Sequence, residues 1–401
     1  MLGKKSILAG CYYTYFIVGA MSLIIGAVLP SLMEKCDLNY AEGGLLLSAH
    51  SIGFLICSTL TGVIAEFLGR KRTVVAISVL IPVALFGLAF TQNPVWLFVF
   101  LLFTGFGRGV VNNTNNVTVS TLADGDAGPV NILHSFFAAG GCLAPAIVAL
   151  FLKLNLGFEA ALISLGVLSV LAIITYLVID IDSVQPAKKP GGREKKKLDA
   201  SFLRKPDFYL VFGIMLFYLC SETSINGWLT SYLKDADLMA AEFAPLMVSL
   251  MWMVMIAGRI LVAAVSKKIS VYKMLLILSA GAAVVYGLFT LTHSPVLIPI
   301  LILCIGLFLA GIYPTSVSAI NRIVDFSAFG MGLAMGGAGV GSIVMPAVTG
   351  FVAQNVAMSA GMVCIWVTVV LMLGCAAAVF LRNRKSAGGE GRRSAERLER
   401  S

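Results

Sequence analysis

Apolar residues occur along this chain in long runs, and short polar turns separate one run from the next. Each run is close to the length of about 20 residues that a helix needs to cross a lipid bilayer. There are twelve such runs, at residues 7–30, 42–64, 73–91, 95–121, 130–152, 158–180, 208–232, 243–265, 273–291, 295–320, 328–353 and 358–381. The pattern predicts an all-α polytopic membrane protein with twelve transmembrane helices.

A polar segment rich in proline, glycine and lysine divides the twelve spans into two sets of six. Such a segment cannot bury a core and is typical of a linker. We therefore expect an N-terminal six-helix bundle over residues 1–180, a cytoplasmic basic linker over 181–207, a C-terminal six-helix bundle over 208–381 and a disordered, basic cytoplasmic tail over 382–401. The fifth and eleventh spans both carry a glycine pair before a proline, which indicates weak internal symmetry.

Composition excludes a soluble fold, because 59% of the residues are hydrophobic and only 12% are charged, against about 25% charged in ordinary globular domains. The formal net charge of +9 comes mostly from the linker and the tail. If both termini lie inside, 24 Lys and Arg fall in the inside loops and termini and three fall outside. This bias predicts cytoplasmic termini in the plasma membrane of a bacterium, the inner membrane. It also explains the basic segments without a nucleic-acid partner.

The residues give no sign of an enzyme or of a bound cofactor. The three His and eight Cys form no metal-ligand spacing, and the chain contains no nucleophile elbow or phosphate loop. We therefore expect no metal, no cofactor and no catalytic residue.

A single carboxylate lies near the middle of the seventh span. Glu222 follows Tyr218 and precedes Asn226 at intervals of four residues, so the three form one polar stripe, and Trp228 lies nearer the outer end. An ion at this depth is costly and should face water or a partner. Because a medium of low dielectric constant favours the neutral acid, Glu222 is a candidate for proton coupling or for binding substrate hydroxyls. A structural ion pair with an Arg is the alternative.

The fourth span carries a similar stripe of Arg108, Asn112 and Asn116. Paired amides can donate to and accept from neighbouring hydroxyls, and a guanidinium can hold a carboxylate with two parallel hydrogen bonds. Arg108 could bind an anion in the cavity, be the counter-ion of Glu222, or take part in helix packing. Arg259, near the cytoplasmic end of the eighth span, is expected to be structural or to act in gating.

Two histidines and several tyrosines are further candidates for the substrate path. His50 and His134 lie within spans, where a histidine can equally be a hydrogen-bonded packing residue. An aromatic ring can pack on the C–H groups of a sugar while its hydroxyl binds polar ones. The tyrosines considered for this role are Tyr12, Tyr13, Tyr15 and Tyr313.

The turn after the second span resembles the loop between spans two and three of the major facilitator superfamily. That loop reads Gly-x-x-x-Asp-Arg-x-Gly-Arg followed by two basic residues, and here the segment runs from Gly62 to Arg72. Glu66 stands where Asp is usual and Phe67 where Arg is usual. The resemblance implies a gating role for Glu66 and Arg70, in which the carboxylate latches onto a neighbouring helix end.

Four further fragments, in the right spans and order, resemble the fucose-permease-like sugar:proton symporters of that superfamily. The fragments are Gly105–Gly109 with the asparagines of the fourth span, Asn131–Gly140, the Glu222 stripe followed by Gly227 and Trp228, and Gly311–Thr315. The resemblance implies two rocking bundles with substrate bound between them near the bilayer midplane.

These observations predict a monomeric secondary transporter in the lipid bilayer that takes up a small polyhydroxylated solute, a monosaccharide or a sugar derivative, with H+ or Na+. The residues expected to bind the solute are Arg108, Asn112, Asn116, Glu222, Asn226, Trp228, Tyr313, Tyr13, His50 and His134. Three alternatives remain open. One is import of an acidic solute with Arg108 as the anion clamp, the second is an efflux antiporter, and the third is a membrane sensor that binds without transport.

Overall fold

The computed structural model describes residues 3–123, 128–184, 201–266, 268–325 and 327–398. Its first half consists of seven α-helices and one short 3-10 helix. They are α1 (Lys4–Lys35), α2 (Tyr40–Leu68), α3 (Arg70–Ser78), α4 (Leu80–Phe90), α5 (Pro94–Ala123), α6 (Gly128–Lys153), α7 (Gly157–Val178) and η1 (Ile181–Ser183).

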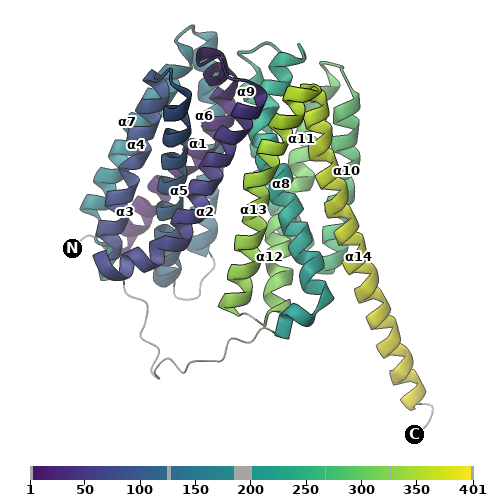
Figure 1. The fold of residues 1–401 in the computed structure, drawn as a ribbon. Coiled ribbons are helices and arrows are strands. Elements are labelled where there is room, and N and C mark those ends of the chain that lie inside the picture. The colour runs from purple at the N-terminus through teal and green to yellow at the C-terminus, as the bar shows by residue number, and fades with distance from the viewer. Residues whose placement is uncertain (1–2, 124–127, 185–200, 267, 326, 399–401) are drawn as a thin grey trace.

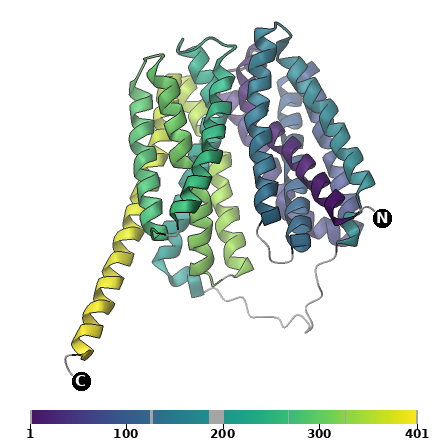
Figure 2. The same cartoon turned by 180° about the vertical axis from the view of Figure 1, so that it is seen from behind.

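The second half repeats this arrangement with one short 3-10 helix and seven α-helices. They are η2 (Ser201–Arg204), α8 (Pro206–Asp235), α9 (Ala244–Val265), α10 (Val271–Leu291), α11 (Leu297–Leu309), α12 (Ile312–Ile323), α13 (Ala328–Asn355) and α14 (Met358–Leu398). Twelve stretches of the described helices are long and apolar enough to cross a membrane. They form two bundles that stand side by side (Figures 1 and 2). The predicted all-α fold with twelve membrane-spanning helices is confirmed.

Two predicted spans are interrupted in the structure, and a proline explains both interruptions. The third span divides after Ser78 into α3 and α4, and the tenth divides at Ala310 and Gly311 into α11 and α12. Proline has no backbone N–H and cannot donate to the carbonyl four residues earlier. Pro82 leaves the carbonyl of Ser78 without that bond, and Pro314 does the same for Ala310. The two breaks fall in different spans of their bundles, the third of the first bundle and the fourth of the second, so each follows from its own proline.

Another difference concerns the C-terminal segment, for which the sequence predicts disorder. In the structure α14 continues without interruption to Leu398 and projects away from the bundles (Figure 1). The segment contains no proline, and its Arg, Lys, Glu and Ala residues are good helix formers. Most of the predicted linker, residues 185–200, lies outside the described residues.

The two ends of the molecule differ in how closely the bundles approach. We call the end that carries Lys4, Val184 and Pro206 the linker end and the opposite end, with Lys35 and Asp235, the far end (Figure 1). Contacts between the bundles run along α1 with α8, α2 with α13 and α6 with α9.

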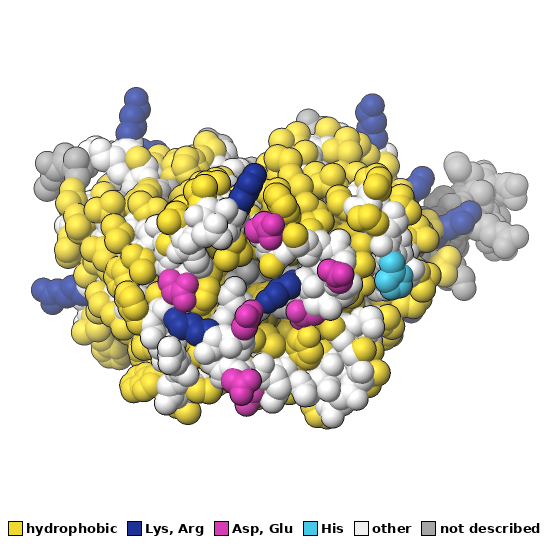
Figure 3. All heavy atoms as spheres, turned by 90° about the horizontal axis from the view of Figure 1, so that it is seen from above, with side chains coloured by type: hydrophobic (Ala, Val, Ile, Leu, Met, Phe, Trp, Pro, Cys, Tyr) yellow, Lys and Arg dark blue, Asp and Glu magenta, His cyan; other side chains and the backbone are white. Residues whose placement is uncertain are grey.

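At the far end the bundles are joined by hydrogen bonds. Lys234 Nζ donates to Glu34 Oε2 at 2.9 Å, the Tyr40 hydroxyl donates to Asp235 Oδ2 at 2.9 Å, and the Tyr40 N–H donates to Gln354 Oε1 at 3.0 Å. Figure 3 looks onto this end and shows charged side chains of both signs gathered across the middle of the face.

Toward the linker end, α2 and α13 diverge. Near the far end, a Cβ added to Gly44 would lie 2.7 Å from the carbonyl oxygen of Pro346, so the two backbones nearly touch. Ser48 Oγ, one turn along α2, donates to the Ile343 carbonyl at 2.6 Å. Further along, a Cβ on Gly336 would meet no heavy atom within 4 Å. The interface between the bundles is therefore closed at the far end and opens toward the linker end.

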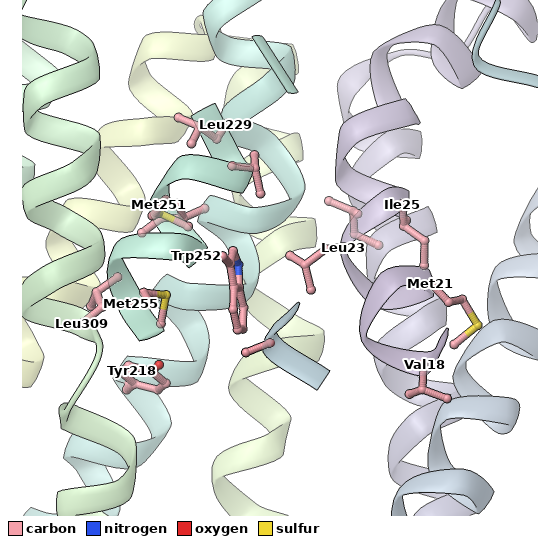
Figure 4. Packing of buried hydrophobic residues seen from close by; sticks show 14 of the residues in the cluster. Val18, Met21, Leu23, Ile25, Tyr218, Leu229, Met251, Trp252, Met255 and Leu309 are labelled. Carbon is pink, nitrogen blue, oxygen red and sulfur yellow. The ribbon is translucent and has the colours of Figure 1, made fainter. Parts of the chain in front are cut away.

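Buried apolar side chains fill both bundles and form one continuous cluster. In the first, Val18 and Met21 of α1 are buried, and in the second Met251 and Met255 of α9 pack toward Leu309 (Figure 4).

Candidate functional site

Polar and aromatic side chains from both bundles converge where the two bundles face each other. The first bundle supplies residues from α1, α2, α5 and α6, and the second supplies residues from α8, α9 and α12. We call this set the central cluster; its members are Tyr15, His50, Arg108, Asn112, Asn116, His134, Phe137, Tyr218, Glu222, Asn226, Trp252, Arg259 and Tyr313.

Arg108 is held by its own bundle. Its Nη1 lies 3.3 Å from His50 Nε2, and its guanidinium carbon lies 4.4 Å from the ring centre of Phe54. His50 Nδ1 lies 2.8 Å from Thr104 Oγ1, and the Thr104 hydroxyl donates to the Leu101 carbonyl at 2.6 Å. A chain of hydrogen bonds thus runs from the backbone of α5 to the guanidinium of Arg108.

The two asparagines of the stripe on α5 bind Tyr15 of α1. The Tyr15 hydroxyl donates to Asn112 Oδ1, and Asn116 Nδ2 donates to the Tyr15 hydroxyl at 3.3 Å. His134 of α6 lies edge-on to the Tyr15 ring, with the ring centres 5.5 Å apart. This arrangement brings together three of the predicted binding residues of the first bundle around one tyrosine.

Glu222 lies on the opposite wall. Its carboxylate accepts a hydrogen bond from the Tyr218 hydroxyl at 2.9 Å, and the Tyr218 ring centre lies 5.7 Å from that of Tyr313. Glu222 interacts electrostatically with Arg259 and with Arg108. Among the described residues, no ion pair of 4.0 Å or less joins Glu222 to either arginine. The sequence left open that Arg108 is the counter-ion of Glu222. A direct ion pair between the two is not formed in this structure.

Asn226 and Arg259 both lie near Trp252 of α9. Trp252 Nε1 donates to Asn226 Oδ1 at 2.9 Å, and the guanidinium carbon of Arg259 lies 5.9 Å from the Trp252 ring centre. The Trp252 ring also approaches Phe137 of the first bundle, with 6.4 Å between ring centres. The Nε of Arg259 is buried and has no hydrogen-bond partner among the described residues.

Four of the predicted residues lie away from the central cluster. The Tyr13 hydroxyl donates to the Leu168 carbonyl at 2.8 Å, so this side chain points toward α7 of its own bundle and not toward the second bundle. Trp228 is fully buried near the far end, where its Nε1 donates to the Pro346 carbonyl at 3.0 Å. Glu66 is exposed at the end of α2, and Arg70 donates to the Val184 carbonyl within the first bundle.

Sequence reasoning missed Trp252 and did not select Tyr15 from its four tyrosines. A signal existed for Trp252, because it precedes Arg259 by seven residues and so lies on the same face of the helix. For Tyr15 the only signal was an interval of two residues from Tyr13, which turns the side chain to a different side of α1. Helical spacing separates the two tyrosines, but the sequence does not say which side faces the other bundle.

Comparison with known proteins agrees with this architecture. The family description "Major Facilitator Superfamily" matches residues 11–327. The glucose/mannose transporter GlcP of Bacillus subtilis (strain 168) is 23% identical over 323 residues, which cover 78% of this chain and 79% of GlcP.

Solved structures share the fold. The crystal structure of the nucleoside transporter NupG superposes with a TM-score of 0.71 at 17% identity, over 95% of this chain and 99% of NupG. That of a D-xylose-proton symporter has a TM-score of 0.75 at 14% identity, over 93% and 96% of the two chains. With two bundles of membrane-spanning helices and a polar cluster between them, this chain is a multi-pass membrane transporter, not an enzyme, and it belongs to the Major Facilitator Superfamily.

Proposed function

We propose that this protein is a proton-coupled secondary transporter that imports a small polyhydroxylated solute, a monosaccharide or a sugar derivative, by alternating access. The observation that carries the proposal is Glu222. It is a lone carboxylate in the central cluster, its hydrogen-bond partner is a neutral hydroxyl, and no arginine among the described residues forms a close ion pair with it. A carboxyl group in such surroundings can bind and release a proton as the central cluster changes its access to water.

The rest of the central cluster suits hydroxyl groups. Asn112, Asn116 and Asn226 offer amides that both donate and accept, and Tyr313 offers a ring together with a hydroxyl. The names of the similar proteins are consistent with this class of solute, since they include a glucose/mannose transporter, a D-xylose-proton symporter and a nucleoside transporter.

The distribution of basic residues supports a cytoplasmic linker end. With that orientation, and with the bundles joined at the far end, the conformation described above is the inward-facing one in the plasma membrane of a bacterium. Glu66 is then free to latch onto the second bundle when the linker end closes, and Arg70 holds the start of α3 against the end of the first bundle. Arg259, near the opening, is a third candidate for gating.

The test is uptake by purified protein in liposomes under an imposed pH gradient, acid outside, with radiolabelled monosaccharides and sugar derivatives. Glu222→Gln should abolish accumulation against a concentration gradient and should leave exchange of labelled for unlabelled solute in place, because Gln keeps the hydrogen-bonding shape and cannot carry the proton. Glu242→Gln, a neutralised carboxylate near the far end, is the matched control and should accumulate solute like the wild type.

Uphill accumulation by Glu222→Gln with an unchanged dependence on pH would contradict proton coupling through Glu222. Uptake driven by a sodium gradient at constant pH would replace H+ by Na+. Saturable binding without any flux would favour the sensor interpretation, and outward movement of solute against inward movement of protons would favour an efflux antiporter.

A further inference from the structure

The charges of the central cluster do not balance. The cluster contains two arginines, Arg108 and Arg259, and one carboxylate, Glu222. With Glu222 ionised the cluster carries one excess positive charge, and with Glu222 protonated it carries two. Arg108 lies near mid-depth, where unpaired charge is costly and calls for a partner. A solute that brings its own negative charge would supply that partner.

His50 is a neutral acceptor in this arrangement. The Thr104 hydroxyl donates its only hydrogen to the Leu101 carbonyl, so it accepts from His50 Nδ1–H. The remaining ring nitrogen, Nε2, then carries a lone pair, which accepts from Arg108 Nη1. We assign the Nδ1–H tautomer from this pattern. A protonated His50 would present an N–H to the guanidinium and would break the chain.

His50 and Phe54 together fix the plane of the guanidinium. His50 is 6% exposed and takes one of the five N–H donors of Arg108, while Phe54 packs against the guanidinium face at 4.4 Å. Neither group neutralises the charge. Arg108 is therefore held in one orientation with donors to spare, which is the preorganisation that binding of a carboxylate by two parallel hydrogen bonds requires.

We propose that the solute is a carboxylate-bearing polyol, that Arg108 binds its carboxylate, and that His50 is a positioning residue which orients Arg108 without touching the solute. The inference rests on the proposed transport function and narrows its substrate class. It has an electrical consequence: a monoanion that enters with one proton moves no net charge, whereas a neutral sugar that enters with one proton moves one positive charge.

The experiment compares acids with their neutral partners in liposomes that contain the purified protein. The pairs are D-glucuronate with D-glucose, D-galacturonate with D-galactose, and D-gluconate with D-glucitol. Uptake is driven by a pH gradient, with and without an inside-negative potential set by potassium and valinomycin. We expect at least one acid to enter, a preference of at least tenfold over its neutral partner, and no acceleration of uptake by the potential.

Variants separate binding from positioning. Arg108→Gln should abolish uptake of the acid, and Arg108→Lys should reduce its apparent affinity roughly tenfold, because Lys keeps the charge and loses the two-pronged geometry. His50→Leu should also weaken binding of the acid at least tenfold, whereas His50→Gln should restore most of it, since Gln can donate to Thr104 and accept from Arg108. Monodispersity and Tm of each variant report whether it is folded.

Two results overturn the inference and leave the proposed function standing: uptake of a neutral sugar but of none of the acids, or uptake of an acid with equal affinity in wild type and a folded Arg108→Gln. Equal loss of binding in His50→Leu and His50→Gln would remove the positioning role. If the pH gradient drove uptake of none of the six solutes, the proposed function itself would fail, and this inference with it.

Discussion

At the scale of single residues, Trp252 links features that the sequence keeps far apart. Its indole N–H binds Asn226 of α8, its ring faces the Arg259 guanidinium two turns along α9, and it approaches Phe137 across the interface between the bundles. Because Trp252 has neighbours in both bundles, its position depends on how the two bundles are arranged. We expect it to act on solute binding through Asn226.

Trp252→Phe should therefore weaken the apparent affinity for the solute about fivefold, which corresponds to the net value of about 1 kcal/mol for one hydrogen bond. Trp366→Phe is the matched control, because Trp366 Nε1 donates to the Ala283 carbonyl inside the second bundle at 2.8 Å. Trp366→Phe should lower Tm as much as Trp252→Phe does, because each variant loses one hydrogen bond, and it should leave the affinity unchanged. Equal affinities in the two variants would remove Trp252 from the binding site.

The sequence identified the charged residues of the site but not their partners. Arg108 and Glu222 stood out because an ion at mid-depth in an apolar span is rare and costly. Their expected pairing rested on opposite charge alone. In the structure each is bonded by a neutral group of its own bundle, His50 and Tyr218, and those bonds depend on the side of a helix that a neighbouring helix covers. No pattern within one span carries that information.

At the scale of elements, the α2–α13 pair is a seam of small residues that is closed along one part and open along the other. Near the far end a Cβ on Gly44 would contact the backbone of Pro346, and Ser48 binds Ile343. Toward the linker end, Gly62 of α2 and Gly332 and Gly336 of α13 have open space. We expect these glycines to come together when the linker end closes.

Two substitutions in this seam should shift the conformation in opposite directions. Gly336→Leu should hold the protein in the present conformation, because the added side chain obstructs closure of the linker end. Gly44→Leu should disfavour this conformation, because it clashes with α13 where the seam is closed. Hydrogen–deuterium exchange would report this as stronger protection of far-end amides in the first variant and weaker protection in the second, with transport at least tenfold slower in both.

Gly374→Leu is the control, since a Cβ at this exposed position of α14 also meets no atom within 4 Å and the helix does not belong to the seam. It should leave both exchange and transport unchanged. Identical exchange patterns in Gly336→Leu and Gly44→Leu would contradict the assignment of the two glycines to opposite states.

The sequence predicted the spans well and the course of the helices less well. Length and hydrophobicity determine whether a helix crosses the bilayer, and both are local quantities. The breaks before Pro82 and Pro314 could have been predicted from the sequence, since each follows from a missing N–H. The divergence of α2 and α13 was not, because the same small residues fit a closed seam and an open one.

At the scale of the whole molecule, the far end is held shut by polar contacts on its surface. Glu34 and Lys234 form an exposed ion pair, with 76% of the Glu34 side chain accessible, and Tyr40 binds Asp235 beside it. Exposed pairs of this kind contribute little each and are weakened by salt. Closure of the far end is therefore maintained by several small contributions, which suits a gate that has to open in every cycle.

Reversing one charge of this gate should open it. Lys234→Glu would bring a third carboxylate beside Glu34 and Asp235 and should expose far-end amides to hydrogen–deuterium exchange, with a smaller effect at high salt. The double variant Glu34→Lys/Lys234→Glu re-forms the pair with the charges exchanged and should return exchange and transport close to wild-type values. Failure of the exchanged pair to restore protection would mean that the ion pair does not hold the gate.

The two halves of the chain meet through side chains and backbone on α1, α2 and α6 of one bundle and α8, α9 and α13 of the other. These contacts determine how the two bundles meet, and the covalent connection adds that each molecule contains one of each bundle. Each bundle therefore resembles a subunit of a two-chain complex. Two polypeptides, produced from a gene divided within residues 185–200, should assemble into a transporter that works.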